Sequence, residues 1–199
     1  MAQGVNPPLG EEARKKFKEY KRQARKLDRG LILVNTGEGK GKTTAALGVA
    51  LRAIGTGWKV AVLQFLKGQW KTGELKAAKR LEPDLVLKPM GKGFTWDKDR
   101  LDEDIEAARE AWQEALRIMN SGEYRLVVLD EINYVLSYGF LSVEEVIEGL
   151  KNRPKHVNVI LTGRNAPQEI IDMADTVTEM RKVKHAYDRG ILAQQGIDF

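Results

Sequence analysis

The chain has 199 residues, enough for one domain with its own core, and its 42% hydrophobic and 31% charged residues are typical of a globular protein. It contains no cysteine, which excludes disulfide bonds, thiolate metal sites and a thiol nucleophile. No apolar run approaches the ~20 residues that a membrane-spanning helix needs, and the polar N-terminus lacks the pattern of a secretory signal. We therefore expect a cytoplasmic protein with no membrane partner.

The net charge of +5 comes from one segment near the N-terminus. Residues 11–29 carry nine Lys and Arg against four Asp and Glu, whereas the remainder of the chain is neutral, so no nucleic-acid partner is expected for the body. Apolar residues recur in this segment at helical spacing: Phe17, Tyr20, Ala24 and Leu27. This pattern, closed by Gly30, predicts a basic amphipathic helix within an N-terminal arm over residues 1–29. Three roles remain open: packing on the domain or on a partner, ordering over an active site, and RNA binding.

After Gly30, short apolar runs alternate with helix-forming stretches. The predicted strands are residues 31–34, 60–65, 85–87, 126–129, 157–161 and 176–180. The clearest helices are residues 43–54 and 101–119, the latter with acidic residues in its first turns, where the helix dipole favours them. Strands that alternate with helices predict an α/β fold over residues 30–199, a mainly parallel β-sheet flanked by helices. A ligand is then expected at the carboxyl ends of the strands.

The run LILVNTGEGKGKTTAA, residues 31–46, combines a buried strand, a glycine-rich turn and the start of a helix. This is the context of a phosphate-binding loop (P-loop), in which backbone N–H groups and the helix N-terminus surround phosphate oxygens. Lys42 is positioned to reach two phosphate oxygens, and Thr43 offers a hydroxyl to Mg²⁺. The residues predicted to bind the nucleotide, which we expect to be ATP, are Thr36, Gly37, Glu38, Gly39, Lys40, Gly41, Lys42, Thr43 and Thr44.

The predicted P-loop is one residue shorter than usual. The common pattern places its first glycine five residues before the glycine that precedes the lysine, but that position is Thr36 and the glycine stands at Gly37. A tighter loop changes the directions in which its N–H groups point. We therefore expect the phosphates to be held differently from those in an ordinary kinase.

A second motif, which is acidic, follows the fourth predicted strand. The run LVVLDE ends in Asp130 and Glu131, which a central parallel strand would place beside the P-loop. We expect a Mg²⁺ (or Mn²⁺) site formed by Thr43, Asp130 and Glu131. One carboxylate would bind the ion directly or through water and the other would orient water, ribose or substrate. The sequence does not distinguish the two roles.

Three loops carry further candidate residues. Phe94 and Trp96 lie in the glycine-flanked run MGKGFTW, which predicts either a platform for a flat ligand or buried rings in a core hairpin. Lys67 follows the second strand and is positioned to meet anionic groups. Arg164 follows the fifth strand, and we expect it to contact a phosphate.

Six motifs occur together in this chain: TGEGKGKTTAALG, VLQFLKGQW, GFTW, VVLDEINYVL, LTGRNAP and KHAYDRGILAQQGIDF. Together they closely resemble the P-loop family of ATP:corrinoid adenosyltransferases over residues 28–199, and GFTW and the C-terminal motif are the most specific. The resemblance implies a RecA-like P-loop fold. It also implies a reaction in which a Co(I) corrinoid attacks the 5′ carbon of ATP and tripolyphosphate leaves, in adenosylcobalamin biosynthesis or corrinoid salvage.

The resemblance also implies roles for single residues. Lys42, Thr43 and Glu131 would stabilise the leaving triphosphate, directly or through the metal ion. Phe94 and Trp96 would crowd the lower face of the corrin ring and displace its axial base. The shortened loop would bind ATP in reversed orientation. A homodimer, an electron donor such as a flavoprotein, and an N-terminal arm that covers the active site are further expectations from the family.

Two other functions fit parts of the sequence. A small-molecule kinase or other NTPase would explain the P-loop and Asp130, and its product would be ADP or phosphate. A nucleotide-dependent RNA-binding switch would use the basic arm. Its binding to polyanions would weaken steeply with salt and would survive the loss of Lys42.

Overall fold

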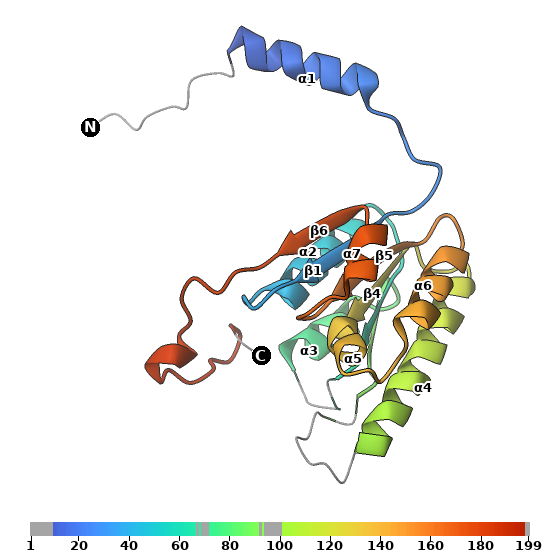
Figure 1. Cartoon of the computed structure of the whole chain (residues 1–199), viewed down its shortest axis with the longest axis vertical. Helices are drawn as coiled ribbons and strands as arrows, with labels where there is room; N and C mark the ends of the chain where they lie inside the picture. The colour runs from blue at the N-terminus through green and yellow to red at the C-terminus, as the bar shows by residue number, and fades with distance from the viewer. Residues whose placement is uncertain (1–9, 67, 69–71, 92, 94–100, 198–199) are drawn as a thin grey trace.

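The computed structural model describes residues 10–66, 68, 72–91, 93 and 101–197. The candidates Lys67, Phe94 and Trp96 lie outside the described residues. One six-stranded sheet forms the centre of the molecule, with the strand order β3-β2-β4-β5-β1-β6 and parallel pairing throughout (Figure 1). Its strands are β1 Ile32–Thr36, β2 Val60–Gln64, β3 Leu85–Pro89, β4 Leu126–Asp130, β5 Asn158–Thr162 and β6 Thr176–Glu179. The predicted α/β fold with a parallel sheet is confirmed.

Helices cover both faces of the sheet. They are α1 Glu11–Gln23, α2 Lys42–Ile54, α3 Gly73–Arg80, α4 Leu101–Asn120, α5 Ile132–Ser137, α6 Val143–Asn152 and α7 Gln168–Met173, followed by a short 3₁₀ helix, η2 Tyr187–Arg189. The core residues of α2 and α3 belong to one hydrophobic cluster, and those of α4, α5, α6 and α7 belong to a second cluster on the opposite face. The predicted helices over residues 43–54 and 101–119 correspond to α2 and α4.

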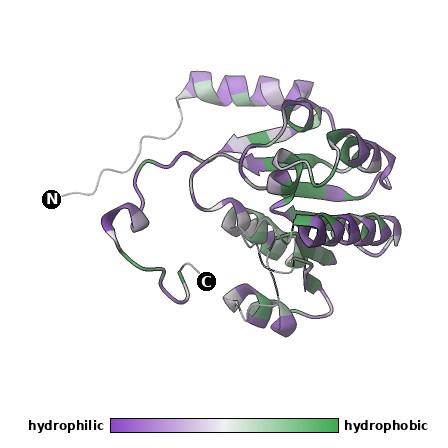
Figure 2. Ribbon diagram, turned by 60° about the horizontal axis from the view of Figure 1, so that its bottom comes forward, coloured by the Kyte–Doolittle hydropathy of each residue, from purple (hydrophilic) through white to green (hydrophobic). Residues whose placement is uncertain are grey.

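The strands alternate between these two clusters, as the period of two in a β-strand requires. In β2, Val60 and Val62 face the alanines of α2, whereas Ala61 and Leu63 face the side of α4, where Trp112 is fully buried. All five residues of β2 and of β4 are buried, as expected for parallel strands covered on both faces. Figure 2 shows the hydrophobic strands inside and the hydrophilic helix surfaces outside. Burial of each Leu, Ile or Val side chain in these clusters contributes roughly 2 kcal/mol to the stability of the folded state.

The N-terminal helix is shorter than predicted. It ends at Gln23, and Ala24 is already extended with ψ of 130°, so the expected helix over residues 11–29 is wrong beyond position 23. Residues 24–29 have no helical structure, and this stretch ends at Arg29, whose guanidinium donates two hydrogen bonds to the Asp175 carboxylate oxygens at 2.7 and 2.6 Å. In Figure 1, α1 stands apart from the sheet. It buries no residue, so the described part of this domain does not cover its apolar stripe.

No helix within the described ranges is both long and apolar enough to cross a membrane.

Candidate active site

The P-loop connects the carboxyl end of β1 to the start of α2 and packs tightly against the chain that follows β6. Gly37 and Gly41 have φ values of +92° and +104°, a region that favours glycine. The Gly39 N–H donates a hydrogen bond to the Met180 carbonyl oxygen at 2.5 Å. A Cβ atom at Gly37 or Gly39 would lie 2.6 or 2.7 Å from that same oxygen. The loop therefore needs glycine at both positions in order to lie where it does.

Lys42 begins α2 and is almost fully buried, with 8% of its surface exposed. Its Nζ donates hydrogen bonds to the carbonyl oxygens of Gly37 at 2.8 Å and Gly39 at 2.7 Å. Burial lowers the pKa of Lys42, and the carboxylate of Glu131 acts in the opposite direction. The ammonium group thus lies inside the curve of the loop, bound to the loop's own carbonyl groups.

Asp130 ends β4 and is completely buried. Its Oδ1 accepts hydrogen bonds at 2.7 Å from the hydroxyls of Thr43 and Thr162, and its Oδ2 accepts one at 3.1 Å from the Gln64 amide. This carboxylate joins the carboxyl ends of β2, β4 and β5 to the first turn of α2. The expected proximity of Thr43 and Asp130, which are far apart in the sequence, is therefore observed. Neither Gln64 nor Thr162 was identified as a site residue from the sequence, although each is the polar last residue of an apolar strand.

Glu131 lies between β4 and α5 and has a left-handed backbone with φ of 65°. Its N–H donates to the Thr162 hydroxyl at 2.9 Å, which holds this unusual turn in place. Glu131 lines the same cavity as Thr43, whereas Asp130 is buried behind it. Within the described ranges, no cluster of three or more His, Asp or Glu side chains has the arrangement of a metal site.

A cavity of about 770 Å³ opens over the P-loop. Among the predicted site residues, those that line it are Glu38, Gly39, Lys40, Gly41, Lys42, Thr43, Thr44, Glu131 and Arg164. Thr36, Gly37 and Asp130 do not line it. The Thr36 hydroxyl instead accepts a hydrogen bond from the Ala166 N–H at 3.2 Å. The structure therefore gathers most of the predicted nucleotide-binding residues at one cavity, at the carboxyl edge of the sheet.

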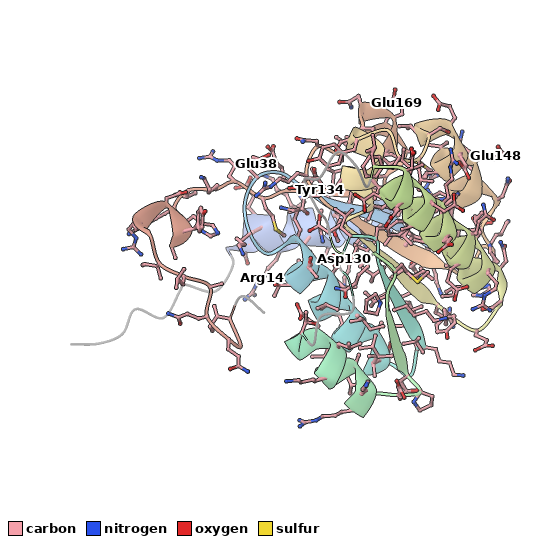
Figure 3. The ribbon with its side chains drawn as sticks, turned by 90° about the horizontal axis from the view of Figure 1, so that it is seen from below. Arg14, Glu38, Asp130, Tyr134, Glu148 and Glu169 are labelled. Atoms are coloured by element: carbon pink, nitrogen blue, oxygen red, sulfur yellow. The ribbon has the colours of Figure 1, made fainter. Side chains whose placement is uncertain are left out.

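One wall of this cavity comes from α5 and the segment after β5. The Arg164 guanidinium pairs with the Glu38 carboxylate, with Nε 3.3 Å from Oε2, and its central carbon lies 6.0 Å from the centre of the Tyr134 ring. Burial raises the pKa of Tyr134. Figure 3 shows Glu38, Tyr134 and Asp130 in the same region of the molecule. Sequence reasoning missed Tyr134 because it stands in an apolar run that has the pattern of an ordinary core helix.

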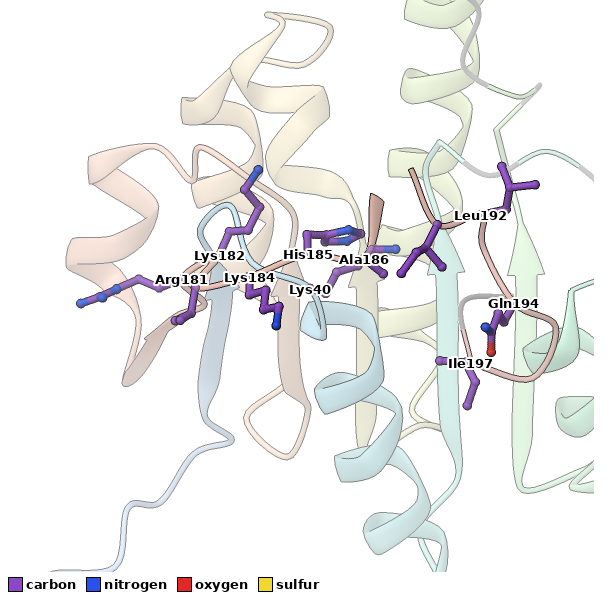
Figure 4. A pocket seen from close by; sticks show the side chains of 11 residues that line it. Lys40, Arg181, Lys182, Lys184, His185, Ala186, Leu192, Gln194 and Ile197 are labelled. Atoms are coloured by element: carbon purple, nitrogen blue, oxygen red, sulfur yellow. The ribbon is translucent and has the colours of Figure 1, made fainter. Parts of the chain in front are cut away.

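The C-terminal segment, residues 181–197, forms the outer wall of the cavity. Tyr187, Ile191 and Leu192 line it together with the P-loop. A second cavity of about 580 Å³ lies between Lys40 and this segment and is lined by basic side chains, among them Arg181 and Lys184, and by apolar ones (Figure 4). No residue of this segment was predicted as a site residue. The segment has little regular secondary structure, so no periodicity in the sequence indicated its position.

Comparison with known proteins identifies the family. The family described as ATP:corrinoid adenosyltransferase BtuR/CobO/CobP matches residues 28–199. The chain belongs to this family. It is 49% identical to the corrinoid adenosyltransferase of Escherichia coli over 173 residues, which cover 86% of this chain and 87% of the relative. The corrinoid adenosyltransferase CobA of Salmonella typhimurium is 48% identical over the same length, with the same coverage.

A third relative shares part of the N-terminal arm with this chain. The corrinoid adenosyltransferase of a Sinorhizobium species is 43% identical over 190 residues, which cover 94% of this chain and 89% of the relative. Residues 28–199 number 172, whereas 94% of the 199-residue chain is about 187 residues, so that match must extend into the segment before residue 28. At least part of the N-terminal arm is therefore shared with a relative.

A solved structure agrees with the fold. The flagellar accessory protein FlaH from Methanocaldococcus jannaschii aligns with a TM-score of 0.52 at 12% sequence identity, covering 81% of this chain and 76% of that chain. This likeness shows the fold alone. Together with the parallel strand order, it supports the expected RecA-like P-loop architecture.

Proposed function

We propose that this protein transfers the 5′-deoxyadenosyl group of ATP to the cobalt of a Co(I) corrinoid and releases tripolyphosphate. The observation that carries the proposal is the family match over residues 28–199, which contains every predicted site residue. The P-loop cavity supports it, since a loop of glycines, Lys42 and Arg164 surround a space large enough for a triphosphate. The setting would be adenosylcobalamin biosynthesis or corrinoid salvage.

The proposed reaction needs no nucleophilic side chain of the protein, because Co(I) is itself the nucleophile. Co(I) supplies the electron pair that forms the cobalt–carbon bond, and the bond from C5′ to the α-phosphate oxygen breaks with its electrons passing to tripolyphosphate. The enzyme must align cobalt with C5′ and stabilise the charge that develops on the leaving group. Lys42 would exchange the carbonyl oxygens of Gly37 and Gly39 for phosphate oxygens. Arg164 would supply a second cation.

We further propose a Mg²⁺ (or Mn²⁺) site formed by Thr43, by Asp130 at the end of β4 and by Glu131, the next residue. The donors fit such an ion, because the Thr43 hydroxyl lies 2.7 Å from Asp130 Oδ1 and hard cations prefer oxygen ligands. Mg²⁺ commonly binds one or two protein groups and completes its shell with water and substrate phosphates. Glu131 lines the cavity, which supports a role for its carboxylate on the side of the substrate. The ion would neutralise charge on the triphosphate.

The remaining proposals come partly from the sequence pattern and partly from the family. Phe94 and Trp96 would contact the lower face of the corrin ring, and Lys67 would meet an anionic group of a substrate. The protein would act in the cytoplasm as a homodimer and receive electrons from a donor such as a flavoprotein. Residues 1–29 would form the arm and residues 30–199 the catalytic domain.

An anaerobic assay in dim light tests the proposal. Purified protein is mixed with chemically reduced Co(I)alamin, ATP and Mg²⁺, and the corrinoid absorbance spectrum is followed. We expect a photolabile adenosyl-cobalt product. Lys42→Ala should slow its formation about a hundredfold or more, since one lost contact to the developing charge typically has this effect. Lys79→Ala, on the exposed surface of α3, is the matched control and should leave the rate unchanged. A wild-type enzyme that leaves the corrinoid spectrum unaltered would refute the proposal.

A further inference from the structure

The backbone around Arg164 is held by the start of α5. Gly163 has φ of +128°, and a Cβ atom there would lie 3.0 Å from Asn133 Cβ and 3.1 Å from the Tyr134 backbone nitrogen. The end of β5 therefore lies directly on α5. Asn133 is fully buried and donates its side-chain N–H to the Gly163 carbonyl oxygen at 3.2 Å. These contacts fix where the Arg164 side chain begins.

The Arg164 side chain has two charged or aromatic neighbours of different kinds. The Glu38 carboxylate of the P-loop forms an ion pair with the guanidinium, with Oε2 3.3 Å from Nε. The centre of the Tyr134 ring lies 6.0 Å from the guanidinium carbon, within the range of a cation–π contact. Tyr134 is itself supported from behind, because Tyr138 stacks on it with ring centres 5.9 Å apart and an interplanar angle of 15°. Glu38, Tyr134 and Arg164 all line the P-loop cavity.

The two neighbours differ in how they respond to a bound triphosphate. Glu38 is an anion whose side chain is 62% exposed, so a triphosphate would compete with it for the guanidinium. Tyr134 is neutral and half-buried, and its ring stays attractive to a cation whether or not a phosphate is present. The Arg164 side chain is itself 44% exposed, and without the ring it would have many solvated rotamers to choose from.

We propose that Tyr134 is a positioning residue for the adenosyl transfer, which holds the Arg164 guanidinium at the mouth of the cavity while Arg164 exchanges Glu38 for the triphosphate. The proposal rests on the proposed function for the identity of the substrate. Tyr134 acts through Arg164 and makes no contact of its own with the reacting atoms. Removal of the ring should therefore matter only while Arg164 is present.

A double-mutant cycle tests this dependence. The values of kcat and KM for ATP are measured with Co(I)alamin for Tyr134→Leu, for Arg164→Ala and for the double variant. We expect Tyr134→Leu to lower kcat/KM about fivefold, the upper range of an exposed cation–π contact. The double variant should match Arg164→Ala within about twofold, which a general loss of structure would not produce.

Two further variants serve as controls. Tyr134→Phe keeps the ring face and should retain activity within about twofold of wild type. Tyr124→Leu removes a partly buried tyrosine just before β4, at the amino ends of the strands and away from the P-loop cavity, and should leave kcat/KM unchanged. The unfolding temperature of every variant shows whether it is folded at the assay temperature.

The proposal is overturned if the losses of the two single variants multiply in the double variant, if Tyr134→Leu behaves as wild type, or if Tyr134→Phe is as impaired as Tyr134→Leu. ATP affinity is measured for the same variants by calorimetry in the absence of corrinoid. If wild type forms no adenosyl-cobalt product, the proposed function fails. The coupling between Tyr134 and Arg164 is then still decided by the cycle in ATP affinity.

Discussion

The Thr162 side chain supports two parts of the site, the Asp130 carboxylate and the backbone turn at Glu131. Its hydroxyl donates to Asp130 Oδ1 at 2.7 Å and accepts from the Glu131 N–H at 2.9 Å, and it is completely buried. Thr162→Val has nearly the same shape but leaves the Glu131 N–H without this acceptor. We expect a loss of about 1–3 kcal/mol in the free energy of unfolding, together with slower adenosyl transfer.

Urea denaturation of Thr162→Val measures this loss, with Thr162→Ser, which keeps the hydroxyl, as the control. Equal unfolding free energies for wild type and Thr162→Val would show that the hydroxyl does not support the turn at Glu131.

At the scale of single residues, sequence reasoning identified the groups that carry recognisable chemistry. Lys42, Thr43, Glu131 and Arg164 all line one cavity, because the P-loop after β1 and the ends of the parallel strands β4 and β5 lie at the same edge of the sheet. Tyr134 was missed since its contact with Arg164 depends on how α5 packs on β5, which no local spacing reveals.

The P-loop as an element depends on its close approach to the chain after β6. In Gly37→Ala the new methyl group would lie 2.6 Å from the Met180 carbonyl oxygen, on a backbone with φ of +92°. The loop must then move, and we expect the variant to lose about 1–3 kcal/mol of stability and to bind ATP at least about tenfold more weakly.

Thermal unfolding and ATP titration of Gly37→Ala check both effects. Gly48→Ala is the matched control, because Gly48 lies within α2 and an added Cβ meets nothing within 4 Å. It should stabilise α2 by up to about 1 kcal/mol. Undiminished ATP affinity in Gly37→Ala would contradict the importance of this contact.

An ion-pair network joins α4 to β3 and makes stability depend on pH. Glu114 accepts hydrogen bonds from Arg117 at 2.6 and 2.7 Å and from Lys88 at 2.5 Å. Hydrogen bonding to Arg117, and then to Lys88, lowers the pKa of Glu114 from 4.5 to about 2. Its contribution to stability is therefore complete above about pH 4.5 and is lost as the pH falls towards 2.

Glu114→Gln should reduce the free energy of unfolding at neutral pH by up to about 1 kcal/mol, because much of the network is open to solvent. The difference from wild type should shrink between pH 4.5 and 2. Denaturation at a series of pH values measures it, with Glu110→Gln on the exposed surface of α4 as the control. A difference that stays constant down to pH 2 would contradict the assignment to Glu114.

Among the elements, the six strands and the helices α2 and α4 were predictable from their apolar patterns. The end of α1 was not. Its sequence continues to favour a helix to residue 29, but residues 10–29 include no buried residue, so no packed face stabilises a longer helix, and the chain at Arg29 is held by Asp175 instead. Tertiary anchoring decided this boundary.

For the whole molecule, the arm and the body are expected to be separable. Deletion of residues 1–23 removes α1, which buries no residue, and should leave the unfolding temperature of the body within about 2 °C of wild type. Arg29→Ala, which breaks the anchor to Asp175, should lower it by more. Calorimetry measures both. A large fall on deleting α1 would mean that the arm is part of the folded domain or of a stabilising oligomer.

At this scale the sequence motifs were sufficient to identify the family, because they are distributed along nearly the entire domain. The wall formed by residues 181–197 was not foreseen, as its position depends on where β6 ends beside the P-loop.

The most direct test of the proposed reaction is the identity of the phosphate species released when the enzyme turns over Co(I)alamin and ATP. Phosphorus NMR of the reaction mixture distinguishes the candidates. Attack of cobalt at C5′ predicts tripolyphosphate in a one-to-one ratio with the adenosyl-cobalt product. The appearance of ADP and orthophosphate, with the corrinoid unchanged, would contradict adenosyl transfer and would make the P-loop that of an ordinary NTPase or kinase.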